Sequence, residues 1–272
     1  TLSNRLTIIP QGCFYLCRSI QHITLPEHLL KIDNGAFTGC SSLEDLKFPT
    51  TIKEIGEMAF AGCAKFVEVT IPEQVINLNK GVFTGCTHLR KIVLSEGTYA
   101  IGDEAFKGCV TLERINIPKS TFRIGKSAFQ NCLQLRNIYL VDHIHLIEEG
   151  AFQECKMLED IVLPESLTIL EQGTFAQCVS LRTIKFNKKL RTIEDGAFYE
   201  CRQLREIILP DSVQTIGEEA FMNCKNLRKV VLPEGLKKIG ASAFKDCESL
   251  PVPYYPSSAM VGKNAFKGCK SK

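Results

Sequence analysis

The stretch LREIILPDSVQTIGEEAFMNC, residues 204–224, decides the fold, because close variants of it recur along the whole chain. Phenylalanine recurs at an interval of 23 residues ten times in succession and at 22 residues once, and a cysteine stands three residues after each of them. These phenylalanines are Phe14, Phe37, Phe60, Phe83, Phe106, Phe129, Phe152, Phe175, Phe198, Phe221, Phe244 and Phe266. A fixed period of this length is the signature of a repeat architecture. The chain is therefore a tandem array of one short unit.

Each unit contains two stretches with strand-like sequence. Ile207 and Leu209 are separated by a single residue, the spacing at which alternate side chains of a strand point inward. Because proline cannot donate to a sheet ladder, we expect Pro210 to end this strand. The later aliphatic pair, such as Leu167 with Leu170, predicts either a short second strand or an extended turn. Gly, Asp and Glu residues before the phenylalanine indicate the entry to a short helical turn, whose dipole would favour acidic side chains there.

The repeat predicts how the units pack. A 23-residue unit cannot bury its own apolar face, so neighbouring units must stack and their first strands must align in parallel. We predict an α/β-type repeat solenoid, rich in β-structure and curved, with a parallel sheet on the concave side and short turns and 3-10 helices on the other. It comprises residues 1–272 as a single domain of about eleven coils. We also expect it to be part of a longer array, because Thr1-Leu2-Ser3 reads as the tail of a preceding strand.

The unit resembles a known repeat. The pattern L-x-x-I-x-L-P-x-x-L-x-x-I-x-x-x-A-F-x-x-C, which Leu204 to Cys224 follows closely, looks like the 23-residue leucine-rich repeat of the BspA-like surface proteins. The resemblance covers nearly the whole chain, and it implies a leucine-rich-repeat stack. It also implies an adhesive or host-interacting ectodomain, not an enzyme, since members are mostly bacterial surface or secreted proteins with expansions in some parasitic protists.

Composition excludes several classes of protein. The 272 residues include 33 Lys and Arg against 30 Asp and Glu, a formal net charge of +3, whereas a nucleic-acid binder normally carries a larger basic surplus on one face. No apolar run approaches the roughly 18 residues needed to cross a bilayer, so we expect no membrane insertion within this chain. No basic segment followed by an apolar stretch opens the sequence, so we expect that a secretory signal is either absent or already removed.

Thirteen cysteines admit a structural or a chemical interpretation. Twelve follow the phenylalanine period and no zinc-binding spacing, which favours a ladder of buried thiols that pack as small apolar side chains. Side chains stacked in a ladder point the same way, whereas a disulfide needs converging Cβ atoms. A few disulfides stay open as the alternative, with Cys13 and Cys17 the first pair to consider. We predict no metal site.

Nothing in the sequence predicts catalysis or a cofactor. Only His143 and His145 are neighbouring histidines, and no nucleophile or carboxylate recurs around them in a catalytic arrangement. Neither a phosphate-binding loop nor a hydrolase or metalloprotease motif occurs. Paired acids such as Glu148-Glu149 and Glu218-Glu219 recur at one repeat position, as expected of a structural turn. We therefore predict that the chain has no catalytic residue and is not an enzyme.

Candidate binding residues follow from the strand period. The eighth and tenth residues after each phenylalanine should point outward from the concave sheet. Around the middle of the chain they combine a tyrosine with hydrogen-bonding groups, a mixture enriched at interface centres, and apolar residues follow. The alternative interpretation is that scattered exposed aliphatics are ordinary. The candidate ligand-binding residues are Lys91, Arg114, Asn116, Asn137, Tyr139, Asp160, Val162, Thr183, Lys185 and Glu206.

A basic row is predicted at one rim of the sheet. The seventh residue after the phenylalanine is arginine in consecutive units at Arg182, Arg205 and Arg228. Such a row suits an acidic glycan or an acidic protein surface. Because Glu159, Asp160 and Glu206 are interleaved with it, we favour neutralisation between neighbouring strands.

Three functions remain at this stage, the third being a structural spacer that holds another domain away from a surface. The first is a recognition or adhesion module of a cell-surface or secreted protein, bacterial rather than eukaryotic because no N-x-S/T glycosylation site occurs, which binds a host extracellular or surface protein or an acidic glycan. The second is a cytoplasmic scaffold or inhibitor that binds a protein, since many unpaired thiols suit a reducing compartment. The ligand and the oligomeric state do not follow from the sequence.

Overall fold

Two sets of short parallel strands build the protein. The computed structural model describes residues 2–270, so the expected continuation of the array before Thr1 lies outside the described residues. The chain divides into two compact units, unit 1 (Thr1–Val141) and unit 2 (Asp142–Lys272), and each is a β-solenoid. We call the strand that begins eight residues after a repeat phenylalanine the first strand, and the one nine residues further on the second strand.

The second strands are present throughout, which decides between the strand and the turn that the sequence left open. In unit 1, β1 (Ile8–Ile9), β2 (Lys31–Ile32) and β3 (Glu54–Ile55) form one parallel sheet, and β5 (Asn77–Leu78), β7 (Ala100–Ile101) and β9 (Arg123–Ile124) form another. Unit 2 begins with β10 (Leu146–Ile147). There β12 (Ile169–Leu170), β14 (Thr192–Ile193), β16 (Thr215–Ile216), β18 (Lys238–Ile239) and β19 (Met260–Val261) form one sheet.

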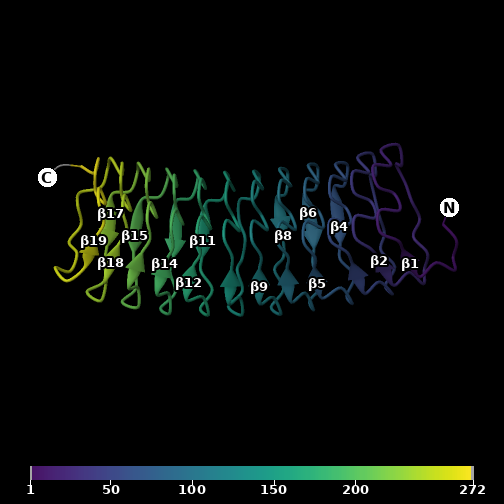
Figure 1. Ribbon diagram of the computed structural model, residues 1–272, viewed down its shortest axis with the longest axis horizontal. Coiled ribbons are helices and arrows are strands. Elements are labelled where there is room, and N and C mark those ends of the chain that lie inside the picture. The colour runs from purple at the N-terminus through teal and green to yellow at the C-terminus, as the bar shows by residue number, and fades with distance from the viewer. Residues whose placement is uncertain (1, 271–272) are drawn as a thin grey trace. The chain divides into compact units, whose positions relative to one another are not determined.

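The first strands are longer but their sheets are interrupted. Unit 1 has one sheet of β4 (Glu68–Thr70), β6 (Lys91–Val93) and β8 (Arg114–Ile115). Unit 2 has two separate pairs, β11 (Asp160–Val162) with β13 (Thr183–Lys185) and β15 (Glu206–Ile208) with β17 (Lys229–Val231). Within unit 1, Figure 1 shows β4, β6 and β8 following one another on one side of the coils and β5 and β9 on the other.

The register confirms the predicted stacking of like residues. Ile161 is paired with Ile184 and Ile207 with Val230, each 23 residues apart. Ten of the repeat phenylalanines, from Phe37 to Phe244, are fully buried, while Phe14 and Phe266 are half-buried. Consecutive rings stack nearly parallel; the centroids of Phe198 and Phe221 lie 5.0 Å apart at 6°. Offset stacking at this separation adds to the burial of apolar surface.

The expected helical turns do not form, and the α/β and 3-10 helix parts of the prediction are wrong: residues 2–270 contain no helix. In every coil the residues two before and two after the phenylalanine have φ between 53° and 77°, and this alternation with right-handed residues breaks any helical repeat. In the described coil around Phe221, the N–H groups of Glu219, Phe221 and Asn223 donate to Ala241, Ala243 and Lys245 of the next coil at 2.8–2.9 Å. We call this segment the turn arc.

The cysteines lie inside the turn arcs as free thiols. All thirteen are unpaired, and the ten from Cys40 to Cys247 are buried. Their thiols are hydrogen-bonded as well as buried: Cys201 Sγ donates to the Phe175 carbonyl of the preceding coil at 3.2 Å. Burial raises the pKa of Cys109 to about 12 and of Cys40 to about 11, and it raises the pKa of Cys86, Cys178 and Cys201 well above the ordinary value of a thiol. These buried thiols therefore stay protonated when the protein is folded.

We predict a steep loss of stability at alkaline pH. A thiol whose pKa is raised by folding releases its proton first in the unfolded chain, whose cysteines ionise near pH ~8.5, so the free energy of unfolding is full below that pH and falls above it. Each fully buried thiol then removes up to about 1.4 kcal/mol per pH unit. Urea unfolding under reducing conditions should show a near-constant free energy below pH ~8 and a steep fall between about pH 8.5 and 10. The exposed Cys13 supplies the control, because Cys13→Ser should leave the profile unchanged. A flat profile to pH ~10 would show that the thiols are not buried.

Candidate functional site

The outward face of the first strands carries the candidate residues, and we call it the first-strand face. In unit 1, Lys91 on β6, Arg114 on β8, and Asn137 and Tyr139 of the next coil are all exposed, Tyr139 most of all at 75%. Arg114 and Asn137 line one hollow of about 570 Å³. The structure thus brings these two candidates together, as the stacking predicts.

Five further candidates lie on the first-strand face of unit 2. Asp160 is paired with Thr183, and Val162 with Lys185, across β11 and β13, and Glu206 begins β15. Their side chains point outward and are exposed, including Val162, while Ile161 between two of them is buried. The alternation inferred from the sequence therefore holds on these strands.

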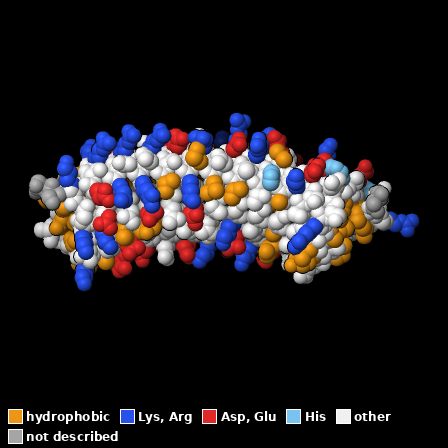
Figure 2. Space-filling model, turned by 90° about the horizontal axis from the view of Figure 1, so that it is seen from above, with side chains coloured by type: hydrophobic (Ala, Val, Ile, Leu, Met, Phe, Trp, Pro, Cys, Tyr) orange, Lys and Arg blue, Asp and Glu red, His pale blue; other side chains and the backbone are white. Residues whose placement is uncertain are grey.

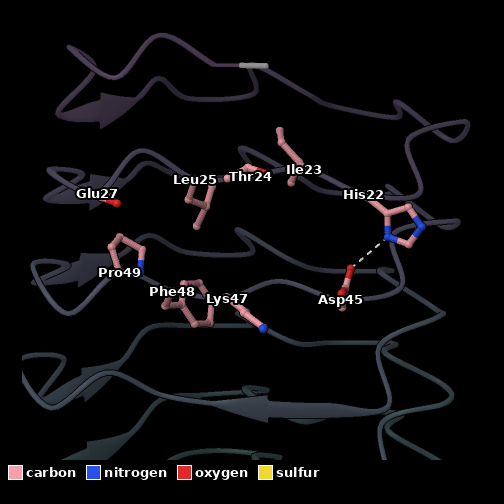
Figure 3. A pocket seen from close by; sticks show the side chains of 9 residues that line it. All are labelled: His22, Ile23, Thr24, Leu25, Glu27, Asp45, Lys47, Phe48 and Pro49. Carbon is pink, nitrogen blue, oxygen red and sulfur yellow. Dashed lines mark hydrogen bonds and ion pairs between the residues drawn. The ribbon is translucent and has the colours of Figure 1, made fainter.

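Charged residues at the eighth position pair with the equivalent residue of the neighbouring coil. Lys91 Nζ lies 3.3 Å from Glu68 Oε2, and Lys229 Nζ lies 2.5 Å from Glu206 Oε1. His22 faces Asp45 in the same way at 3.0 Å, as Figure 3 shows, and the hydrogen bond to Asp45 raises the pKa of His22. Opposite charges directly across a sheet stabilise it modestly, so these pairs serve the fold and set the polarity of the face.

The basic row at the seventh position is not neutralised as we expected. Arg182 lies 3.7 Å from Glu159 Oε2, but neither Arg205 nor Arg228 forms an ion pair with any residue in the described part of the chain. Arg205 and Arg228 lack an acidic partner among the described residues because Glu206 forms its ion pair with Lys229, and Asp160 accepts a hydrogen bond from the Thr183 hydroxyl. Figure 2 shows Lys and Arg side chains in a row along one edge of unit 2, at the left.

Asn116 has a structural role that the sequence did not reveal. Its Oδ1 accepts a hydrogen bond from the Leu94 N–H at 2.9 Å, and its Nδ2 donates to the Leu94 carbonyl at 3.2 Å. The side-chain amide thus replaces the main-chain ladder beyond Ile115, where β8 ends. The Asn137 side chain, in contrast, has no hydrogen bond to a described residue.

Sequence reasoning missed a phenylalanine that lines a hollow on the first-strand face of unit 2. Phe186 occupies the eleventh position after its repeat phenylalanine, where neighbouring coils have the buried Leu163 and Leu209, yet Phe186 is half-buried. We call this space the unit 2 hollow. It measures about 660 Å³ and lies between β13 and β15. Its lining includes Arg182, Thr183, Lys185, Phe186, Arg205 and Ile208. The sequence does indicate this residue, because phenylalanine replaces leucine at the eleventh position after Phe175.

The other candidate chemistry gains no support. His145 Nδ1 lies 2.8 Å from the carbonyl oxygen of His143, a contact within an exposed loop. Among residues 2–270, no group of three or more His, Cys, Asp or Glu side chains is arranged to hold a metal ion. The same residues include no helix long and apolar enough to cross a membrane.

Comparison with known proteins identifies the repeat. A sequence family described as BspA type Leucine rich repeat region (6 copies) matches residues 7–136 and 145–272. No curated protein matches the chain in sequence. A leucine-rich repeat protein from Bacteroides ovatus ATCC 8483 is similar in structure, with 31% identity, a TM-score of 0.82, and coverage of 98% of this chain and 75% of that one. One from Eubacterium ventriosum ATCC 27560 has 22% identity, a TM-score of 0.67 and coverage of 98% and 81%, and shows the fold alone.

The pneumococcal vaccine antigen PcpA also shares the fold. It has 20% identity and a TM-score of 0.55, and the match covers 90% of this chain and 61% of that one.

The two asparagines on the first-strand face of unit 1 should differ in their effect on stability. Asn116→Ala should lower the free energy of unfolding by about 1–3 kcal/mol, because it leaves the Leu94 N–H without its partner. Asn137→Ala, the matched control, should change it by less than about 0.5 kcal/mol. Urea denaturation of both variants measures the difference. Equal effects would mean that the amide of Asn116 does not hold the backbone.

Proposed function

The chain belongs to the BspA-type leucine-rich repeat family, and from this premise we propose that it is a non-enzymatic recognition or adhesion module of a cell-surface or secreted bacterial protein. In this proposal it binds a host or partner macromolecule, chiefly a protein, through the first-strand face and its rims. Repeat folds of this kind commonly present extended binding surfaces.

The composition of the first-strand face carries the proposal. Val162, Ile208 and Val231 occupy the tenth position in three of four successive coils of unit 2 and are exposed by 55%, 57% and 42%. Basic side chains stand beside them, with Lys185 in the same column and Arg205 three residues before Ile208. Exposed apolar side chains gathered with arginine are typical of the centre of a protein interface, whereas isolated ones are ordinary.

A cytoplasmic scaffold is the second candidate, and the thirteen free thiols favour it. Burial weakens this support. Ten of the thiols are inside the coils, and a protonated, inaccessible thiol is a poor target for oxidation in any compartment. Surface or secreted placement therefore remains our proposal, supported by what the family resemblance implies and by the shared fold of PcpA, a pneumococcal vaccine antigen.

Capture experiments with matched variants test the proposal. The immobilised protein should retain one or a few surface-labelled proteins of cultured epithelial cells, and the variant Val162→Asn/Ile208→Asn/Val231→Asn should lose at least 90% of this capture, since it removes the apolar column. Ile169→Asn changes an exposed aliphatic on the second-strand side, 41% exposed against 42% for Val231, and should retain capture. Equal loss in both variants would contradict binding through the first-strand face. Capture only from a cytosolic extract of the same cells would support the scaffold instead.

A further inference from the structure

The sheet of first strands opens at one place in unit 2. β11 and β13 form one pair and β15 and β17 another, with no pairing between β13 and β15. The same two coils remain joined elsewhere, because β14 pairs with β16 and Gln177 N–H donates to the Tyr199 carbonyl at 2.7 Å. The opening is therefore local to the first strands, and the unit 2 hollow lies in it.

Phe186 accounts for the opening. The coils on either side carry the smaller Leu163 and Leu209 at this position, and both are buried. The Phe186 ring instead meets the Phe198 ring edge-on, at 6.1 Å and 78°, so it stands between the two coils rather than joining the parallel stack. A ring in a space sized for leucine forces its neighbours apart. As a result Phe186 and Ile184 are partly exposed, whereas the equivalent Ile161 and Ile207 are buried.

The unit 2 hollow has an apolar floor and a basic rim. Ile184, Phe186 and Ile208 supply the floor. Lys185 and Arg205 stand at the rim, and neither forms an ion pair with any residue described. Two carboxylates also line the hollow, and both are engaged: Glu206 pairs with Lys229, and Asp160 accepts a hydrogen bond from the Thr183 hydroxyl. An apolar cleft with a few polar groups at its edge is the usual form of a binding site.

We propose that the unit 2 hollow binds an acidic polypeptide segment, which inserts an apolar side chain onto Phe186 and places a flanking Asp or Glu against Arg205 and Lys185. The proposal rests on the proposed recognition function and names its partner chemistry. A polypeptide fits better than a glycan, because an aliphatic and aromatic floor has to be covered by an apolar group. The arginine fork matches a carboxylate in two parallel hydrogen bonds.

A second opening, in unit 1, also has a phenylalanine at the eleventh position but no surplus of basic side chains among the described residues that line it. Phe48 replaces leucine at the same position and meets Phe60 edge-on at 5.6 Å and 72°. No pairing joins residues 45–47 to β4 in the described structure, and a hollow of about 570 Å³ lies there. Its charged lining is Asp45, Lys47, Glu68 and Glu73. Asp45 pairs with His22 and Glu68 with Lys91, so Lys47 and Glu73 are the charges that remain and they balance. The described lining of the unit 1 opening therefore lacks a basic surplus, and this opening is expected to bind the acidic segment more weakly than the unit 2 hollow.

Fluorescence anisotropy with synthetic peptides tests the proposal. The probe is a fluorescein-labelled peptide of about ten residues with one Phe flanked by Asp and Glu, at about 0.15 M salt, where exposed charges are partly screened. Its Phe→Ala form and a form with Lys in place of the acids should each bind at least about 10-fold more weakly, a loss of about 1.4 kcal/mol or more. Heparin is the glycan probe.

Variants of the protein locate the site. Arg205→Glu should weaken binding of the acidic peptide about 10-fold or more, and Phe186→Leu, which restores the residue of the other coils, should do the same by closing the hollow. Lys263→Glu, an exposed basic residue elsewhere in unit 2, is the matched control and should change binding less than about 2-fold. Thermal unfolding shows whether each variant is folded. Phe186→Leu keeps a core residue type, so it tests the hollow even where the charge reversal destabilises the coil.

Three outcomes would overturn the proposal: no peptide binding to the wild-type protein, equal weakening by Lys263→Glu and Arg205→Glu, or Arg205-dependent binding of heparin alone, which would assign the rim to a glycan. Failure here is distinguishable from failure of the recognition function. If the first-strand face still captures a cell-surface protein, and Phe186→Leu does not affect that capture, the face binds its partner without this hollow.

Discussion

Within each unit, the hydrogen bond from one repeat phenylalanine N–H to the carbonyl before the next repeat phenylalanine is the constraint on which the rest of the structure depends. The Phe221 N–H donates to the Ala243 carbonyl, 22 residues later, at an N···O distance of 2.8 Å, and equivalent bonds recur from coil to coil in both units. It fixes how much chain fits in one coil. Once that length is fixed, residues at the same repeat position must stack on one another, and a side chain that packs well in one coil also packs well in its neighbours. The ring stack and the thiol column follow from this register.

The same constraint separates the positions that build the fold from those free to bind. Main-chain groups of the strands and the turn arc form hydrogen bonds between coils, and inward positions are filled by apolar side chains. The outward positions of the strands are therefore free to vary in charge and polarity. Phe186 is an informative exception, because it is a core position that disturbs the face. Its ring interrupts one hydrogen-bonded ladder while β14–β16 and the turn arc hold the same coils together. Recognition surfaces can arise in this way without loss of the stack.

A structural feature of this protein can be predicted from the sequence when the repeat period alone determines it. The stacking of Phe221 on its neighbours and the outward direction of Val162 follow from period alone. The turn arc could not be predicted in this way, because Glu218 and Glu219 before Ala-Phe resemble a helix start. The sequence feature that argued against a helix was glycine two residues before or after the phenylalanine, as at Gly196 and Gly108, and it is not present in every coil. Side-chain pairing was also beyond the sequence. Whether Glu206 neutralises Arg205 or Lys229 depends on geometry across the sheet that residue types do not determine.

The stacking of equivalent phenylalanines can be measured most directly by nuclear Overhauser effects between rings in protein labelled only at phenylalanine. Phe198 and Phe221, with centroids 5.0 Å apart, should give a strong cross-peak, and so should Phe221 and Phe244 at 5.1 Å. Rings two coils apart should give none. Cross-peaks that join each ring to its successor along the chain would agree with coils stacked in register. Their absence, or cross-peaks between non-consecutive repeats, would contradict the account.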